Sequence, residues 1–410
     1  MRSSESEASV NAQRDRTKVA VTGLRGIPGV MGGIETHCEE LLPRIAALAP
    51  EMDITVLGRA PYLPNNSNWF RGVAVKSLPT LRRPGLEAVI STFLGVLHAR
   101  RRGYDLLHIH AIGPGLLAPL ARMLGMTVVL THHGVDYDRA KWGRFARLML
   151  KLGERWGVSA AHHVIAVSPS LFTSLRERFP RHARKISHIP NGAPALEHAS
   201  ESREAALDRL GLEQGGFILA VGRLVPEKGF DYLIDAFRAS GSDKTLAIVG
   251  ASDHDSEFAR RLSSMADGRV RFLGLQPRSV LRHLYESTAL FVLPSFHEGL
   301  PIVALEAGRC GAPMLMSDIP ANRDVGLPAA NYFPVGDVDA LAEALRTPAE
   351  TFGVNGDEIR RRFNWDVVAH ASTDVYRKVA CRGSSVASLR ARSPSPSEAE
   401  AASRDEAFTG

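Results

Sequence analysis

The sequence predicts an α/β protein with two doubly wound parallel sheets, each covered by helices on both faces. Short apolar runs rich in β-branched residues alternate along the chain with helical patterns, an order typical of right-handed βαβ units. The alternation breaks at residues 190–194, a Pro-Asn-Gly-Ala-Pro segment, so we place a hinge there. The 410 residues are enough for two domains. We expect these domains to face each other across a crevice at the carboxyl ends of their strands.

The expected strands form one series on each side of this hinge. The first series comprises residues 19–22, 54–57, 73–78, 106–110, 128–131, 164–168 and 186–190. The second series comprises residues 217–221, 246–249, 270–273, 290–293 and 314–316. Helices fit between the strands, as in residues 230–238, where Leu233, Ile234 and Phe237 share one face.

The hinge and the polar ends divide the chain into five parts. Residues 17–194 form the first doubly wound domain and residues 195–362 form the second. The pattern of residues 363–382 predicts a further helix, which could cross back to the first domain. The polar segments 1–16 and 383–410 predict disordered tails, because they contain few residues that could join a core.

Composition excludes several classes of protein. Hydrophobic residues make up 44% and charged residues 23% of the chain, which is typical of a globular protein. Three cysteines without a Cys-x-x-Cys pair exclude a disulfide scaffold and a cysteine zinc site. The first residues lack the apolar core of a signal peptide, and we find no apolar run long enough for a membrane span. We therefore expect a cytoplasmic protein.

A glycine-rich loop follows the first strand. Residues 23–33 contain five glycines, including Gly32 and Gly33, and a helix is expected from about Ile34. Glycines remove side chains from the approach to a helix N-terminus, where free N–H groups and the helix dipole favour an anion. The spacing matches neither a Walker A loop nor the Gly-x-Gly-x-x-Gly fingerprint. A tight turn without a ligand remains the alternative.

Two cations follow the first strand of the second series. Arg223 and Lys228 lie in the loop at residues 222–229, where ligands bind in doubly wound sheets. Both could reach one diphosphate, arginine as a fork and lysine as a point charge. Solvated surface cations are the alternative.

Two carboxylates separated by seven residues give the most specific signal. They are Glu298 and Glu306, within residues 296–308. Glu306 falls in an expected helix whose other residues are nearly all apolar, so it needs a partner, which sugar or ribose hydroxyls would provide. The backbone N–H groups near Gly299 and Leu300 would face the same crevice. Structural carboxylates that cap a neighbouring loop are the alternative.

These residues carry a family resemblance. The Glu-x7-Glu segment, the Gly-Arg-x4-Lys-Gly loop at residues 222–229 and the turn at residues 320–323 together resemble the retaining nucleotide-sugar glycosyltransferases of family four. The resemblance runs from about Lys18 to Arg377. It implies the GT-B fold, in which two Rossmann-like domains face across a cleft. Residues 17–194 would then be the acceptor domain and residues 195–362 the nucleotide-sugar donor domain.

Motifs in the first half point to a subgroup. Residues 25–28 (Arg-Gly-Ile-Pro), 32–36 (Gly-Gly-Ile-Glu-Thr) and 131–136 (Thr-His-His-Gly-Val-Asp) resemble a bacterial subgroup. Members of this subgroup act in exopolysaccharide and O-antigen (lipopolysaccharide) assembly and include rhamnosyl- and mannosyltransferases.

The resemblance implies roles for the phosphate-binding residues. Arg223 and Lys228 would bind the donor pyrophosphate and stabilise the leaving nucleotide diphosphate. Gly32 and Gly33 would close over the same phosphates from the first domain.

The resemblance also implies roles toward the sugar. Glu298, with the N–H groups of Gly299 and Leu300, would hold the hydroxyls of the donor sugar, and Glu306 would hold the ribose hydroxyls. His133 would face the sugar, although a core histidine with satisfied hydrogen bonds is the alternative.

We name no general base, because family members are thought to react on the front face of the donor. We assign no Asp-x-Asp segment of the sequence to a metal ion, so we expect no metal ion and no cofactor besides the nucleotide diphosphate sugar as co-substrate.

Two basic amphipathic stretches lie in the first half. Residues 81–103 carry five arginines around an apolar run, and residues 139–155 combine cations with Trp142 and Phe145. Such stretches suit peripheral contact with the anionic inner face of the cell membrane, and ordinary helices with a cationic outer face are the alternative. The net charge of +6 does not decide between them. We expect no nucleic-acid partner, because no nucleic-acid-binding motif appears in the sequence.

The expected function is that of a retaining glycosyltransferase. It would move a hexose or deoxyhexose from a nucleotide diphosphate sugar to a lipid-linked saccharide acceptor in bacterial surface polysaccharide biosynthesis. A non-hydrolysing sugar-nucleotide 2-epimerase and a catalytically inactive nucleotide-sugar-binding protein are the alternatives.

Overall fold

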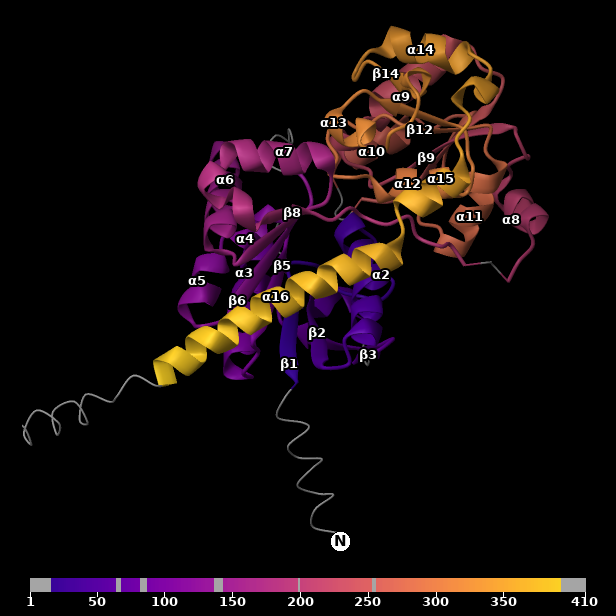
Figure 1. Cartoon of the computed structure of the whole chain (residues 1–410). Coiled ribbons are helices and arrows are strands. Elements are labelled where there is room, and N and C mark those ends of the chain that lie inside the picture. Colours follow the sequence, from indigo (N-terminus) through magenta and orange to yellow (C-terminus); the bar gives the residue numbers. More distant parts are fainter. Residues whose placement is uncertain are drawn as a thin grey trace, which may run out of the picture.

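The computed structural model contains two parallel sheets with helices on both faces (Figure 1), which confirms the predicted fold class. It describes residues 16–391 except for 64–67, 82–86, 136–142, 198–199 and 253–255, and it describes side chains as far as residue 381. The segments 1–15 and 392–410, most of both expected tails, lie outside the described residues.

The first sheet has the strand order β3-β4-β2-β1-β5-β6-β7-β8. Its neighbouring strands are parallel except for β3 and β4. The strands are β1 (Thr17–Thr22), β2 (Met52–Arg59), β3 (Trp69–Phe70), β4 (Val73–Leu78), β5 (Leu106–His110), β6 (Thr127–His132), β7 (His163–Ala166) and β8 (Ile186–His188). Because β2 and β5 flank β1 on opposite sides, the strand order reverses there, and the loops after β1 and β5 lie next to each other.

Helices cover both faces of this sheet. They are α2 (Gly33–Leu48), α3 (Glu87–Arg101), α4 (Ile112–Gly115), α5 (Ala118–Met123), α6 (Arg144–Ala160) and α7 (Pro169–Arg178), with short 3-10 helices η1 (Ala60–Tyr62) and η3 (Pro180–Lys185). In α2, Cys38, Leu41, Leu42 and Ile45 are buried, at the spacing of one helix face. They pack against β1 and β2, while α3 and α6 contribute to the core on the opposite face.

The second sheet is parallel throughout, with the order β11-β10-β9-β12-β13-β14. Its strands are β9 (Phe217–Val221), β10 (Thr245–Val249), β11 (Val270–Phe272), β12 (Leu290–Leu293), β13 (Met314–Ser317) and β14 (Tyr332–Phe333). Here the strand order reverses between β9 and β12. The loops after these two strands therefore leave the sheet side by side.

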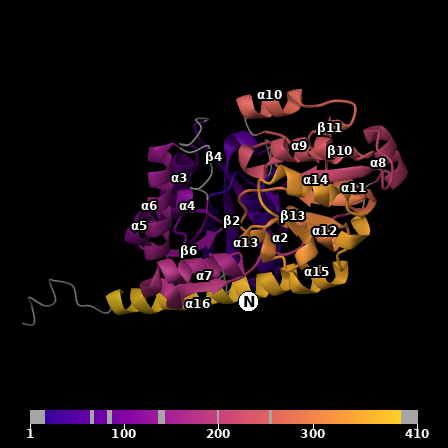
Figure 2. The same cartoon turned by 90° about the horizontal axis from the view of Figure 1, so that it is seen from above.

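The helices of the second half surround this sheet (Figure 2). They are α8 (Arg203–Leu210), α9 (Phe230–Ser240), α10 (Glu257–Ser264), α11 (Arg278–Ser287), α12 (Ile302–Arg309), α13 (Pro320–Arg323), α14 (Val338–Arg346) and α15 (Gly356–Arg362), with short 3-10 helices η4 (Pro226–Lys228), η5 (Ala329–Asn331) and η6 (Ala349–Phe352). The helix α8 begins directly after Ser202, which caps its N-terminus by accepting a hydrogen bond from the N–H of Ala205.

The last helix, α16 (Trp365–Ala391), leaves the second domain and packs along α2 of the first (Figure 1). Arg44 pairs with Asp366 across these helices, with 3.0 Å between Nε and Oδ1. The helix extends past Gly383, where the sequence analysis begins a disordered tail, so that boundary is wrong. Its Ser-, Ala- and Arg-containing continuation contains no proline before residue 394, and alanine and arginine are good helix formers.

The hinge segment at residues 190–194 has no regular secondary structure and is held by the second domain. The N–H of Ala193 donates to the Phe363 carbonyl at 2.7 Å, and Arg309 donates to the Ala193 carbonyl at 3.1 Å. None of the described helices is both long and apolar enough to cross a membrane.

Candidate active site

The strand reversal in the second sheet brings two of the predicted motifs into contact. Lys228 lies in the loop after β9, and Glu298 lies in the loop after the adjacent strand β12. Lys228 Nζ donates to Glu298 Oε1 at 2.5 Å, and Ser295 Oγ donates to the same oxygen at 2.7 Å. The sequence analysis assigned the two side chains to different parts of a ligand, and it did not foresee that they pair with each other.

This ion pair is shielded from water. The Lys228 side chain is 15% exposed and the Glu298 side chain is 11% exposed. A charge pair with so little solvent around it is stable only while both partners are present. An anion that binds to Lys228 would therefore compete with Glu298, and it would leave that carboxylate available for another donor.

Arg223 lies in the same loop as Lys228 and is half-buried. The backbone beside it is fixed, because the Leu224 N–H donates to the Ala251 carbonyl at 3.1 Å. Ala251 follows β10, so the loop that carries both cations is tied to the neighbouring strand. The two residues predicted to bind the phosphates thus lie in one loop, whose backbone is held by a hydrogen bond to the neighbouring strand.

The two domains touch at the backbone of His133, Gly134, Glu298 and Gly299. A Cβ atom added to Gly299 would collide with the His133 carbonyl oxygen, and one added to Gly134 would lie 3.0 Å from the Gly299 Cα. Gly134 also has a φ of +117°, which favours glycine. Glycine at both positions allows this contact, and it places His133 next to the Glu298 loop.

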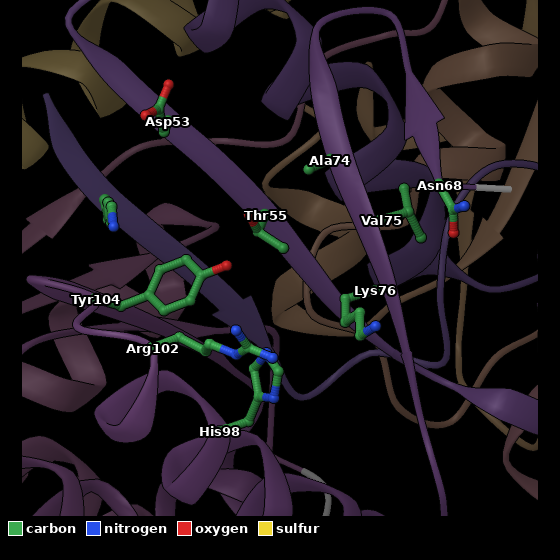
Figure 3. A pocket seen from close by; sticks show the side chains of 10 residues that line it. Asp53, Thr55, Asn68, Ala74, Val75, Lys76, His98, Arg102 and Tyr104 are labelled. Carbon is green, nitrogen blue, oxygen red and sulfur yellow. The ribbon is translucent and has the colours of Figure 1, made fainter. Parts of the chain in front are cut away.

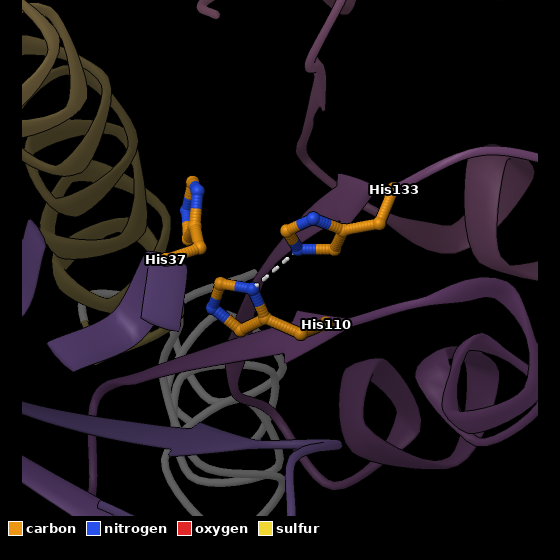
Figure 4. A group of neighbouring side chains, drawn as sticks. All are labelled: His37, His110 and His133. Atoms are coloured by element: carbon orange, nitrogen blue, oxygen red, sulfur yellow. Dashed lines mark hydrogen bonds between the residues drawn. The ribbon is translucent and has the colours of Figure 1, made fainter. Parts of the chain in front are cut away.

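His133 belongs to a cluster of histidines that the sequence analysis missed (Figure 4). His133 Nε2 lies 2.9 Å from His110 Nδ1, and the His37 ring centroid lies 4.9 Å from that of His133. Two features of the sequence could have indicated the cluster. One is the His-x-His pair at the end of β5, and the other is His37 in the first turns of the helix after the glycine loop. Both lie where the strand order of the first sheet reverses.

Burial controls the charge of these rings. It lowers the pKa of His37 to about 4 and that of the neighbouring His108 to about 3. Burial also lowers the pKa values of His110 and His133 well below 6.5, and the neighbouring histidines add to the effect. The four rings are therefore neutral near pH 7, and each offers one N–H and one lone pair.

His132 points away from this cluster into the first domain. Its Nδ1 accepts from the Gly134 N–H at 3.2 Å, so its Nε2 carries the proton that is donated to Glu154 at 2.9 Å. This arrangement agrees with a role for His132 in the core and leaves His133 as the residue that faces the second domain.

Glu306 is buried on α12, and protein groups surround it. Tyr285 Oη donates to Glu306 Oε2 at 3.3 Å, and Arg278 Nη2 lies 3.6 Å from Oε1. Burial raises the Glu306 pKa to about 7, although Arg278 and Tyr285 oppose the shift. Arg278 also pairs with Glu40 of α2 at 2.9 Å, so it links the two domains beside Glu306. The sequence analysis did not single out Arg278.

The glycine loop of the first domain folds over the start of α2. The N–H of Arg25 donates to Glu35 Oε1 at 2.9 Å, and the N–H of Gly29 donates to Glu39 Oε2 at 2.9 Å. A Cβ on Gly32 would collide with the Glu35 carboxylate, whereas a Cβ on Gly33 would meet no described atom within 4 Å. Gly33 is thus the open approach to this helix end, while Glu35 already places a negative charge in the first turn.

A separate hollow lies at the opposite ends of the first strands (Figure 3). Its volume is about 560 Å³, and its lining includes Lys18, Asp53, Thr55, Asn68, Lys76, His98, Arg102 and Tyr104. Lys18 and Asp53 lie at the amino ends of β1 and β2. The hollow therefore contains none of the predicted site residues.

Comparisons with known proteins agree with this arrangement. A family model described as "Glycosyltransferase Family 4" matches residues 31–195, and a model described as "Glycosyl transferases group 1" matches residues 202–350. The two matched ranges correspond to the two domains and together cover more than half of the chain.

Curated relatives match over most of their length. A D-inositol 3-phosphate glycosyltransferase of Kribbella flavida is 28% identical over 89% of this chain and 96% of its own. An alpha-maltose-1-phosphate synthase of Mycolicibacterium smegmatis is 26% identical over 86% of this chain and 97% of its own. An Escherichia coli UDP-Gal:alpha-D-GlcNAc-diphosphoundecaprenol alpha-1,3-galactosyltransferase is 27% identical over 60% of this chain and 66% of its own.

Solved structures share the fold. Sucrose-phosphate synthase of Thermosynechococcus elongatus superposes with a TM-score of 0.74 at 22% identity, over 90% of this chain and all of the other. Anabaena HepE in complex with UDP and glucose superposes with a TM-score of 0.69 at 19% identity, over 88% of this chain and all of the other.

Two Rossmann-like domains whose strand-end loops meet at His133 and Glu298 define the chain as a nucleotide-sugar glycosyltransferase of the GT-B fold. Within that class, the chain belongs to glycosyltransferase family four.

Proposed function

We propose that this glycosyltransferase acts with retention of anomeric configuration and without a metal ion. It transfers a hexose or deoxyhexose from a nucleotide diphosphate sugar to a lipid-linked saccharide in bacterial surface polysaccharide biosynthesis. The observation that carries the proposal is the Lys228–Glu298 pair beside the loop of His133. The galactosyltransferase relative, whose printed name includes a diphosphoundecaprenol-linked acceptor, supports the acceptor class.

In the proposed reaction, the donor diphosphate takes the place of Glu298 at Lys228 and is also bound by Arg223. Glu298, released from Lys228, then accepts hydrogen bonds from the sugar hydroxyls, together with the N–H groups of Gly299 and Leu300. This exchange couples the two halves of donor binding, because neither buried charge is left without a partner.

The chemical step breaks the bond between the anomeric carbon and the diphosphate oxygen and forms a bond to the acceptor oxygen on the same face. The departing phosphate oxygen takes the acceptor's proton, so no protein base is required. Arg223 and Lys228 stabilise the negative charge that develops on the leaving group, which is the principal electrostatic task of the site. Because these two cations neutralise the charge on the leaving diphosphate, we propose that the reaction needs no metal ion.

Four further residues complete the proposed donor site. His133 is neutral and can exchange hydrogen bonds with a sugar hydroxyl. Gly33, whose surroundings are open, lets the diphosphate approach the start of α2 next to Gly32. Glu306 binds the ribose hydroxyls after Arg278 shifts toward Glu40.

We also propose that α6 holds the enzyme against the anionic inner leaflet, where lipid-linked acceptors reside. Phe145 is 73%, Leu148 is 52% and Trp156 is 45% exposed, and these residues share one face of α6 with exposed cations. An exposed aromatic and cationic face of this kind suits the headgroup region of a membrane. The neighbouring expected residues 139–142 lie outside the described ones.

The test is a thermal-shift screen of nucleotide diphosphate sugars, followed by transfer assays on lipid-linked acceptors. We expect a stabilising donor to be consumed only with acceptor present, and the anomeric proton couplings of the product to match those of the donor. Epimerisation at C2 without acceptor would instead identify an epimerase. Binding without turnover on any acceptor would identify a binding protein.

A further inference from the structure

Three histidine rings converge where the first domain meets the second (Figure 4). His37 comes from α2, His110 from the end of β5 and His133 from the loop after β6. One ring nitrogen of each lies within 4.8 Å of the other two. His37 and His110 are buried, whereas His133 is half-buried, so the cluster can be reached from solvent at one side.

The hydrogen bonds around His37 determine where its proton lies. Asn191 Nδ2 donates to the Leu300 carbonyl at 2.8 Å, which leaves Asn191 Oδ1 as the acceptor facing His37 Nδ1 at 2.8 Å. His37 therefore carries its proton on Nδ1 and presents a lone pair at Nε2. That Nε2 is buried and has no hydrogen-bond partner among the described residues. Buried acceptors are normally satisfied by a protein donor, a water or an ion, so this nitrogen is available to a ligand.

His110 and His133 can each free one ring nitrogen for a ligand. The 2.9 Å contact between His110 Nδ1 and His133 Nε2 holds one shared proton in the absence of a ligand. His110 Nε2 lies 3.6 Å from Cys38 Sγ, a weak acceptor. In the tautomer with its proton on Nε2, His110 directs this N–H at the sulfur, and its Nδ1 keeps a lone pair for a ligand. In the tautomer with its proton on Nδ1, His133 keeps a lone pair on Nε2.

We propose that His37, His110 and His133 together bind one divalent transition-metal ion of the zinc type. Imidazole ligands favour zinc, copper and nickel over magnesium and calcium. Tetrahedral zinc holds nitrogens at about 2.0–2.1 Å and hence about 3.3 Å from one another. The three nitrogens lie within 4.8 Å of one another, so the rings must move closer together to bind one ion.

The surroundings match those of a metal site in two further respects. The Nδ1–H of His37 bonds to a fixed amide oxygen, which is the outer contact that orients most metal-binding histidines. The half-buried side of His133 leaves a fourth position open to water. Each ring keeps one N–H when the ion binds, so the ion replaces a hydrogen bond and no proton is released. The ion takes no part in the charge stabilisation proposed for Arg223 and Lys228, and with the ion on Nε2 the Nδ1–H of His133 is still available to donate to a sugar hydroxyl.

The test uses the full chain with any purification tag removed and Co²⁺ alone as the probe. We expect one equivalent of Co²⁺ to give the intense visible absorption of tetrahedral nitrogen coordination, and Zn²⁺ to remove it. His37→Ala and His110→Gln should each weaken binding about tenfold or more, and Asn191→Ala about 10-fold to 100-fold, as for other outer-shell partners. His370→Ala, on the exposed face of α16, is the matched control and should change nothing.

Circular dichroism and thermal unfolding of each variant separate loss of the site from loss of the fold. If His37→Ala does not fold, Asn191→Ala and His110→Gln decide the question. The proposed site would be overturned if the wild type showed no Co²⁺ absorption, or only the weak absorption of octahedral coordination. It would also be overturned if the folded variants bound Co²⁺ with the same affinity as the wild type. The readout needs no donor sugar, so this result and the transferase proposal stand or fall separately.

Discussion

The backbone of Gly299 lies directly against the carbonyl oxygen of His133, so that no side chain fits between them. One residue belongs to the loop after β12 of the second sheet and the other to the loop after β6 of the first. The loops that carry Glu298 and His133 therefore meet at one backbone junction between the two domains.

Gly299→Ala tests this junction. The added methyl group would force the loops apart, and such overpacking costs typically about 1–3 kcal/mol. We expect a fall of about tenfold or more in kcat/KM for transfer. Gly268→Ala, in the same domain with no described atom within 4 Å of its added Cβ, is the control and should leave kcat/KM unchanged. Equal kinetics in the two variants would show that the contact has no role.

Arg223→Ala and Lys228→Ala test the stabilisation of the leaving diphosphate. Loss of one preorganised donor to a developing charge costs about 10²–10³ in kcat. We expect kcat to fall by this order while the donor Kd from calorimetry changes much less. Lys244→Ala is the control, because Lys244 bonds to the Gly215 carbonyl outside the motif loops. A change confined to KM would contradict a role in the transition state.

The raised pKa of Glu306 predicts that the free energy of unfolding depends on pH. Its folded pKa of about 7 lies above its ordinary value of 4.5, so between these values the folded protein holds a proton that the unfolded chain has released. Stability should therefore fall as the pH rises from about 4.5 to 7, by up to about 3 kcal/mol. Denaturant titrations should show that Glu306→Gln removes this fall. An identical pH profile in the variant would rule out the raised pKa.

The ribose role of Glu306 has its own signature. If the ionised carboxylate accepts the ribose hydroxyls, donor affinity should rise as the pH increases through about 7, because the ionised form is the better acceptor. Calorimetric titrations with donor should show this rise in the wild type and a weaker, flat affinity in Glu306→Gln. Affinity unchanged by the substitution would remove Glu306 from the ribose site.

Much of this arrangement could be predicted from the sequence because it follows from the order of strands. The hydrophobic runs locate β9 and β12, and the reversal of strand order between them is what brings Lys228 to Glu298. The seven residues between Glu298 and Glu306 similarly place Glu298 in the loop after β12 and Glu306 on the helix α12 that follows.

The rest depends on packing between distant segments. The partners of Glu306 are Arg278 and Tyr285 of α11, and nothing in their local sequence marks them. His37 meets His110 only because α2 covers the end of β5, and the tautomer of His37 depends on Asn191 in the hinge. Such contacts are set by tertiary structure and leave no periodic pattern in the sequence.

The exposed face of α6 predicts membrane binding. Full-length protein should float with vesicles that contain anionic lipid and should not float with neutral vesicles. The double substitution of Phe145→Ser and Trp156→Ser should remove most of this binding, because it removes apolar area from the interface. Trp69→Ser, at a tryptophan of β3 that is 66% exposed, is the control. Equal flotation with neutral and anionic vesicles would contradict the electrostatic part of the proposal.

The structure of the protein with a bound nucleotide diphosphate sugar tests the shared site most directly. We predict that the diphosphate contacts Arg223 and Lys228, that the Lys228–Glu298 pair is broken, and that the sugar lies between Glu298 and His133. A donor bound elsewhere, with Lys228 still paired to Glu298, would contradict a single site built by the two domains.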